Sequence, residues 1–131
     1  MSSRNLTDLC PEIRILCLQW QDKVKEAGHD AVIICTWRSP AEQIQAYKAG
    51  KSKRIHGPHN YVDANGNPSS RAFDFCVLVN GKITWSTSLD NDKDGTPDYE
   101  ELGKIGEGLG LEWGGSWPNL KDFDHLQLKG A

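Results

Sequence analysis

The chain has 131 residues, a formal net charge of −3 and 37% hydrophobic residues, which suits one domain with its own core. No stretch is strongly basic, and this argues against nucleic acid as a partner. No apolar run approaches the ~20 residues of a membrane-spanning helix. We therefore expect a single domain over residues 1–131 that acts as a monomer without stable membrane anchoring.

The first part of the chain predicts three elements from its apolar periodicity and its cap residues. They are a helix over residues 9–27 capped by Thr7 or Asp8, a buried β-branched strand over 31–36, and a helix over 40–49 capped by Ser39. Residues 51–71 are rich in Gly, Pro, Asn and Ser, which predicts a long loop. Loops of this length are uncommon unless they have a functional role.

The second part predicts a hairpin, a helix and a last strand. The elements are strands over 72–79 and 82–85 joined by an Asn80-Gly81 turn, a helix over 99–109, a turn-rich aromatic segment over 113–117 and a strand over 123–128. No repeat or linker interrupts the chain. The sequence therefore predicts an α+β fold, with a small antiparallel sheet and helices packed on it.

Three side chains have the character of metal ligands. Asp74 lies between two phenylalanines in a strand, and His125 lies in another apolar strand. A charge on a buried strand is costly unless it is paired or bound to a metal. His59 lies in the long loop, and with Asp74 and His125 it could complete a three-ligand zinc site that leaves one position open.

An ordered set of motifs gives the chain a family resemblance. The motifs are Thr36-Trp37-Arg38-Ser39-Pro40 with Gln43, His59-Asn60-Tyr61, Ala72-Phe73-Asp74, Trp113-Gly114-Gly115 with Trp117, and Asp122 with His125 and Gln127. Together they resemble the zinc D-alanyl-D-alanine carboxypeptidase and L-alanyl-D-glutamate endopeptidase family, which includes phage endolysins. The resemblance runs from about residue 31 to residue 128.

The resemblance implies a role for each matching residue. His59, Asp74 and His125 match the zinc ligands, and Asp122 matches the catalytic acid and base. Arg38 matches the arginine that binds the substrate and steadies the oxyanion. The implied partner is the peptide stem of peptidoglycan, and the implied cofactor is Zn²⁺.

The chain departs from the usual pattern of the family in the spacing that follows the loop histidine. Residues 60–73 make the spacer between His59 and Asp74 longer than is usual in the family, although a loop absorbs added length at little cost. His56 is a rival ligand, but only His59 stands in the His-Asn-Tyr motif. His29 follows a helix stop and belongs to no motif, so we expect it at the surface.

The remaining site residues rest on weaker patterns. Asp124 competes with Asp122 as the proton carrier, but alternation along a strand would point it away from His125. Asp122 can reach the metal only from a bend before that strand. Trp113 and Trp117 either wall the substrate groove or pack in the core. Gln127 is a candidate partner for a ligand side chain.

A second pattern, over residues 90–101, matches a twelve-residue calcium loop. Carboxylates occupy its first, third, fifth, ninth and twelfth positions and glycine its sixth; the predicted Ca²⁺ ligands are Asp90, Asp92, Asp94, Asp98 and Glu101. The alternative is a solvated acidic turn in which Asp98 caps the next helix.

The four cysteines, at positions 10, 17, 35 and 76, either pair or serve as small buried hydrophobic residues. No Cys-x-x-Cys spacing is present, and the expected compartment is reducing, so we favour unpaired structural thiols.

Three functions remain open from the sequence. The first is a peptidoglycan L-alanyl-D-glutamate endopeptidase of the phage endolysin type. The second is a D-alanyl-D-alanine carboxypeptidase or dipeptidase, and the third is a non-catalytic calcium-binding wall module. Residues 1–8 show no signal-peptide pattern. We therefore expect a cytoplasmic protein that reaches the wall through a separate membrane pore, which favours the first function.

Overall fold

The elements alternate between helices and short strands. The computed structural model describes residues 2–51, 56–119 and 121–131. In chain order it contains a 3₁₀ turn at Leu6–Asp8, helix α1 at Pro11–Glu26, strand β1 at Asp30–Cys35, helix α2 at Pro40–Lys48, a 3₁₀ turn at Pro58–Asn60, strands β2 at Ala72–Val79 and β3 at Lys82–Thr84, helix α3 at Asp98–Gly108, strand β4 at Glu112–Trp113, a 3₁₀ turn at Gly114–Ser116 and strand β5 at His125–Gln127.

The strands form one antiparallel sheet. Its order is β1-β2-β5-β4, and β3 pairs with the end of β2 through the hairpin. Asn80 and Gly81 have φ values of 54° and 76° at that turn, the left-handed conformation that a two-residue hairpin requires. The predicted α+β fold with a small antiparallel sheet is confirmed, although β4 was expected only as part of a turn.

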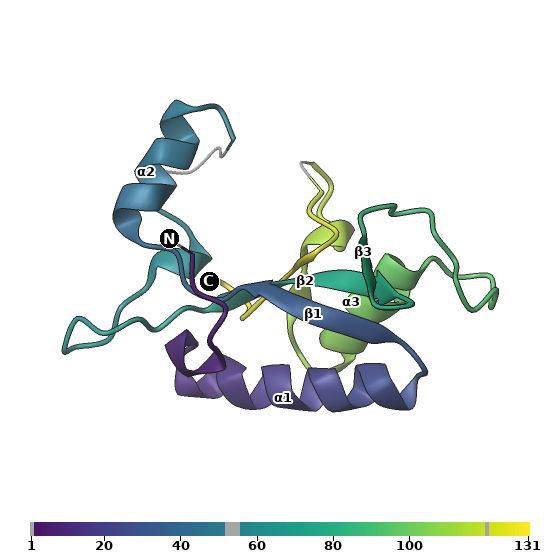
Figure 1. Cartoon of the computed structure of the whole chain (residues 1–131). Helices are drawn as coiled ribbons and strands as arrows, with labels where there is room; N and C mark the ends of the chain where they lie inside the picture. The colour runs from purple at the N-terminus through teal and green to yellow at the C-terminus, as the bar shows by residue number, and fades with distance from the viewer. Residues whose placement is uncertain (1, 52–55, 120) are drawn as a thin grey trace.

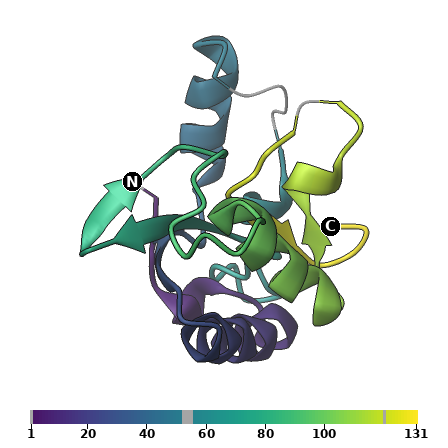
Figure 2. The same ribbon diagram turned by 90° about the vertical axis from the view of Figure 1, so that its right-hand side faces the viewer.

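Helices α1 and α3 cover the same face of the sheet (Figures 1 and 2). Trp20 of α1 lies between them: its ring centroid is 5.3 Å from that of Phe73 and 4.8 Å from that of Phe75. Its indole N–H donates to the carbonyl of Leu102 in α3 over 2.9 Å. This buried aromatic cluster joins α1, α3 and β2 into one hydrophobic core.

Helix α2 lies on the opposite side of the sheet from α1 (Figures 1 and 2). Ser39 caps it as predicted, because its hydroxyl accepts a hydrogen bond from the Glu42 N–H over 3.2 Å. Residues 52–55 of the predicted long loop lie outside the described residues. The part that the structure describes, 56–71, ends beside the start of α1, where the Cys10 N–H donates to the Ser70 carbonyl over 2.8 Å.

The start of the first helix differs from the prediction. Cys10 is its cap residue and Pro11 its first residue, so the predicted cap at Thr7 or Asp8 is wrong. Pro11 lacks an N–H and fits only the first turn of a helix. Residues 6–8 therefore form a separate 3₁₀ turn.

All four cysteines are unpaired, as predicted. Burial raises the pKa of Cys17 to about 12, so this thiol stays protonated and serves as a small core residue. Among the described residues, no helix is both long enough and apolar enough to cross a bilayer.

The contact between α3 and Trp113 provides a test of the core. A Cβ at Gly103 would overlap the buried indole ring of Trp113, whereas a Cβ at Gly108 meets nothing. We expect Gly103→Ala to lower the free energy of unfolding by about 1–3 kcal/mol and Gly108→Ala to raise it by about 0.5–1 kcal/mol. Urea denaturation of both variants measures the difference, and equal effects would contradict the packing.

Candidate active site

A row of side chains crosses three strands on the face opposite α1. Asp74 of β2 pairs with His125 of β5 and with Cys35 of β1. Residues directly opposite each other in antiparallel strands point to the same face. The flanking Phe73 and Phe75 point into the core, and this explains why a carboxylate interrupts an apolar strand.

His59 reaches the same point from the 3₁₀ turn before β2. The Asn60 side chain holds this turn: its oxygen accepts the Gly57 N–H over 2.7 Å, and its amide donates to the Arg38 carbonyl over 2.8 Å. The Arg38 N–H also donates to the His59 carbonyl over 3.0 Å. The His-Asn pair therefore ties the loop to the segment that follows β1.

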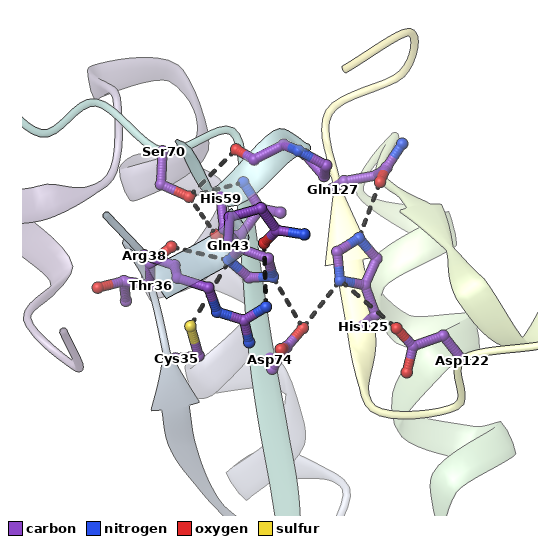
Figure 3. Close-up of polar contacts among 12 residues, drawn as sticks. Cys35, Thr36, Arg38, Gln43, His59, Ser70, Asp74, Asp122, His125 and Gln127 are labelled. Carbon is purple, nitrogen blue, oxygen red and sulfur yellow. Dashed lines mark hydrogen bonds and ion pairs between the residues drawn. The ribbon is translucent and has the colours of Figure 1, made fainter. Parts of the chain in front are cut away.

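Each imidazole has one ring nitrogen engaged away from Asp74 (Figure 3). Nδ1 of His59 lies 2.9 Å from the Thr36 carbonyl, and Nε2 of His125 lies 2.8 Å from Oε1 of Gln127. Because these oxygens only accept, both nitrogens carry the proton. Gln127 therefore has the supporting role that the sequence suggested.

The other two ring nitrogens converge on one oxygen. Nε2 of His59 is 3.2 Å from Oδ1 of Asp74, and Nδ1 of His125 is 2.8 Å from the same atom. In the neutral tautomers just described, both nitrogens direct a lone pair at a carboxylate. That arrangement is repulsive unless a positive charge lies among the three atoms.

The pKa values of His59 and Asp74 also indicate that a positive charge stabilises this site. Burial alone would lower the pKa of His59, but the Asp74 carboxylate raises it well above its usual value. Burial alone would raise the pKa of Asp74, but His59 and His125 bring it far below its usual value. Without a cation, a proton on an imidazole balances Asp74, and a divalent ion would take that role and release the proton.

The donor set fits zinc, which binds imidazole nitrogen and carboxylate oxygen. Cys35 is also near, with Sγ 3.8 Å from Nδ1 of His59, and it joins His59 and Asp74 in a group of potential ligands. That nitrogen, however, already donates to Thr36. The atoms that converge on one point, and are therefore the candidate ligands, are Nε2 of His59, Oδ1 of Asp74 and Nδ1 of His125. The rival His56 instead sets its ring against Tyr61.

Asp122 lies in the bend before β5, as its predicted role requires. Its Oδ2 is 4.0 Å from Nδ1 of His125, and its side chain is 48% exposed. Its N–H donates to the Gly114 carbonyl over 3.0 Å, and a Cβ at Gly114 would overlap the Asp122 backbone. The Gly-Gly turn therefore allows Asp122 to sit beside the histidine.

The strand alternation from which the orientation of Asp124 was predicted does not apply to this residue. Strand β5 begins only at His125, so strand alternation does not extend back to Asp124. Burial, followed by a hydrogen bond with Asp122, raises the pKa of Asp124 to about 9. Asp124 is therefore protonated at neutral pH and donates to the carboxylate of Asp122, a partnership that the sequence did not reveal.

Arg38 faces the site from the segment between β1 and α2. Its guanidinium donates to Oε1 of Gln43 over 3.1 Å, and Gln43 is buried in α2. Both residues line a cleft of roughly 790 Å³ that also contains the three proposed ligands and Asp122. Gln43 belongs to the sequence motif, but only the structure gives it a role.

The two tryptophans have different environments. Trp117 lines the cleft, and its ring centroid is 5.5 Å from that of His125. Trp113 is only 4% exposed and donates to the Phe123 carbonyl from within the core, so of the two alternatives it packs in the core and does not bind substrate in the groove wall. Glu112, which the sequence did not single out, accepts from both Trp117 and Gln127.

The acidic loop lies outside this cleft, because none of its predicted Ca²⁺ ligands is among the lining residues.

His29 was expected at the surface, and this prediction is wrong. It is 8% exposed, and its Nε2 lies 2.6 Å from Oε2 of Glu101. The first residues of α3 cover it, a contact that the sequence does not indicate.

Loss of one histidine tests the ligand assignment. We expect His59→Ala to lower zinc affinity by at least about 100-fold, because a direct ligand contributes more than a supporting partner. His56→Ala, its matched control three positions earlier, should keep one equivalent of zinc. Competition with a chromophoric chelator measures both, and equal zinc retention in the two variants would contradict the assignment.

The chain is similar to known peptidases in sequence and in fold. A family model described as D-alanyl-D-alanine carboxypeptidase matches residues 68–128. The chain is 35% identical, over 93% of its length and 74% of the relative's, to the peptidoglycan L-alanyl-D-glutamate endopeptidase CwlK of Bacillus subtilis. The solved structure of the Serratia marcescens L-Ala D-Glu endopeptidase ChiX has a TM-score of 0.68 at 22% identity, covering 98% of this chain and 88% of that one.

The LdcB LD-carboxypeptidase is a more distant structural neighbour. Its TM-score is 0.54 at 14% identity, and the alignment covers 92% of this chain and 58% of that one. At these identities, the two solved structures establish a shared fold. The extended similarity to the Bacillus protein establishes the family. The chain is therefore an enzyme that belongs to the M15 peptidase family.

Proposed function

We propose that the protein is a zinc-dependent endopeptidase that hydrolyses the L-alanyl-D-glutamate bond in the peptide stem of peptidoglycan. The observation that carries the proposal is the convergence of His59 and His125 on one oxygen of Asp74, in a cleft that also holds Asp122 and Arg38. The choice of bond rests on the similarity to CwlK, whose name specifies it.

The three ligands would hold Zn²⁺ at the floor of the cleft. When bound there, zinc supplies a Lewis acid that polarises a peptide carbonyl and makes water more acidic. Thr36 and Gln127 fix the two imidazole rings by binding their outer nitrogens. Such partners keep the tautomers and orientations that metal binding needs.

Asp122 carries protons in this proposal. Its carboxylate is close to His125 but half exposed, so it can take a proton from water and return it to the leaving amine. Protonated Asp124 donates a hydrogen bond to Asp122 and so helps to hold the Asp122 carboxylate in place. In this proposal Asp122 is the general base, and Asp124 is the hydrogen-bond donor that positions it.

Arg38 binds the negatively charged parts of the substrate. Its contact with Gln43 holds the guanidinium toward the cleft, where it can pair with a stem carboxylate or with the developing oxyanion. Lys51 and Lys121 also line the cleft. A lining with these positive side chains suits a stem peptide that contains D-glutamate.

The proposal includes the biological role of the enzyme and its route to the cell wall. The resemblance to phage endolysins supports a role in lysis, in which the protein reaches the wall through a separately made pore. D-alanyl-D-alanine carboxypeptidase activity is a second candidate, because the matching family model carries that description.

Analysis of digested peptidoglycan separates these candidates. We expect mass spectrometry to find new stem peptides with a free N-terminal D-glutamate, because the L-alanyl-D-glutamate bond has been cut. Release of free D-alanine instead would favour the carboxypeptidase. The absence of any product from the zinc-loaded protein would contradict both and leave a wall-binding module.

Replacement of Asp122 tests the proton-transfer step. We expect Asp122→Asn to lower kcat by about 10²–10⁴-fold, the usual contribution of a general acid or base, while zinc content stays at one equivalent. Asp22→Asn, an exposed control on α1, should leave both unchanged. Loss of zinc from Asp122→Asn, or near-normal kcat, would assign Asp122 a different role.

A further inference from the structure

We propose that residues 90–101 form a second metal site, separate from the active site, that binds calcium at the start of helix α3. The proposal does not depend on the peptidase activity. Its ligands are the carboxylates of Asp90, Asp92, Asp94, Asp98 and Glu101. Sequence spacing suggested these residues, and the structure brings them together with His29, which the spacing could not include.

The acidic side chains form two groups that share one member. One oxygen each of Asp90, Asp92 and Asp94 lies within 4.8 Å of the other two. Ligand atoms of Asp92, Asp98, Glu101 and His29 meet the same limit. Because Asp92 belongs to both groups, the loop and the first turn of α3 direct their carboxylates toward a common region.

The side chain of Asp98 provides independent support for a bound cation. The residue is 1% exposed, and its Oδ2 is one of the buried polar atoms without a hydrogen-bond partner within the described part of the chain. The other oxygen, Oδ1, accepts the Asn91 N–H over 3.1 Å. A buried carboxylate oxygen without a donor is costly, and a bound cation would satisfy it.

Helix capping does not account for this carboxylate. Asp98 is the first residue of α3, the cap position belongs to Pro97, and the cap makes no side-chain hydrogen bond. The alternative in which Asp98 caps the helix is therefore wrong. Its carboxylate turns toward the loop and His29 instead.

The charge of the segment also calls for a cation. Residues 90–101 contain six acidic side chains and one basic side chain, Lys93. Repulsion among these carboxylates destabilises the folded loop, and a divalent ion at its centre would reduce that repulsion.

His29 orients the last carboxylate of the loop. Its Nε2 is 2.6 Å from Oε2 of Glu101 and 3.2 Å from Oδ2 of Asp92. His29 lies between α1 and β1, so it ties the acidic loop to a different part of the fold. A calcium ion would therefore connect α3 to the turn that joins α1 and β1.

The ligand set favours calcium over a transition metal. Calcium takes 6–8 oxygen ligands, and the loop offers five carboxylates, together with the Thr96 carbonyl at the seventh position of the pattern. A transition-metal site centred on the single imidazole would leave the Asp90 and Asp94 carboxylates without a cation. The side chain of Asp92 is 35% exposed, which leaves a path for the ion to enter.

Calcium titration of the zinc-loaded 131-residue chain tests the proposal. We expect calorimetry to show one equivalent of Ca²⁺ bound, with a Kd in the range of about 10⁻⁷–10⁻³ M that such loops span. Millimolar CaCl₂ should raise Tm, because the ion binds only the folded loop. The same concentration of MgCl₂ should raise Tm less, because Mg²⁺ demands a smaller octahedral site.

Two variants and one control locate the ion. We expect Asp92→Asn to weaken Ca²⁺ binding by about tenfold or more, because it removes a charged ligand, and Asp98→Asn to do the same if it folds. Asp92 is exposed enough for its variant to fold in either case. Asp22→Asn should bind as the wild type does, and all three should retain zinc.

Three results would overturn the proposal. They are the absence of calcium binding to the wild type, unchanged calcium binding in Asp92→Asn, and occupation of this loop by Mn²⁺ or Zn²⁺ but not by Ca²⁺. Because the readouts are calcium affinity, Tm and zinc content, each of these results is independent of whether the protein cuts peptidoglycan.

Discussion

Two imidazole nitrogens that share one carboxylate oxygen set the chemistry of this enzyme. Nε2 of His59 and Nδ1 of His125 approach Oδ1 of Asp74 at 3.2 and 2.8 Å. The outer nitrogens of both rings donate to fixed acceptors, so the inner nitrogens present lone pairs. Three electron-rich atoms at this separation repel one another unless a proton or a metal cation lies among them. The surrounding contacts, from the Thr36 carbonyl to Gln127, serve to hold that arrangement.

Side chains alternate between the two faces of β2, so the active site and the hydrophobic core lie on opposite sides of this strand. Phe73 and Phe75 contact Trp20 on one face, while Asp74 faces the cleft on the other. Because successive side chains of a strand point to opposite faces, the ligand can be charged without placing that charge in the core. Changes at Asp74 therefore act on the cleft first, and changes such as those at Gly103 act on the core.

Carboxylates have two further roles on this scaffold. Beside Asp122, burial and a neighbouring acid keep Asp124 protonated, so Asp124 can act as a hydrogen-bond donor. At the start of α3, acidic side chains gather around His29 and a buried oxygen of Asp98 that has no donor. Asp124 is neutralised by a proton, and the acidic cluster by the calcium that we propose.

The local elements and the candidate ligands can be predicted from the sequence alone. Strand 72–79, the Ser39 cap and the Asn80-Gly81 turn follow from periodicity and backbone chemistry, and the ordered motifs were enough to choose His59, Asp74 and His125. The positions of Asp124, His29 and Trp113, in contrast, became clear from the three-dimensional structure. Their surroundings depend on where β5 begins and on segments distant in the chain, and local spacing contains no information about such contacts.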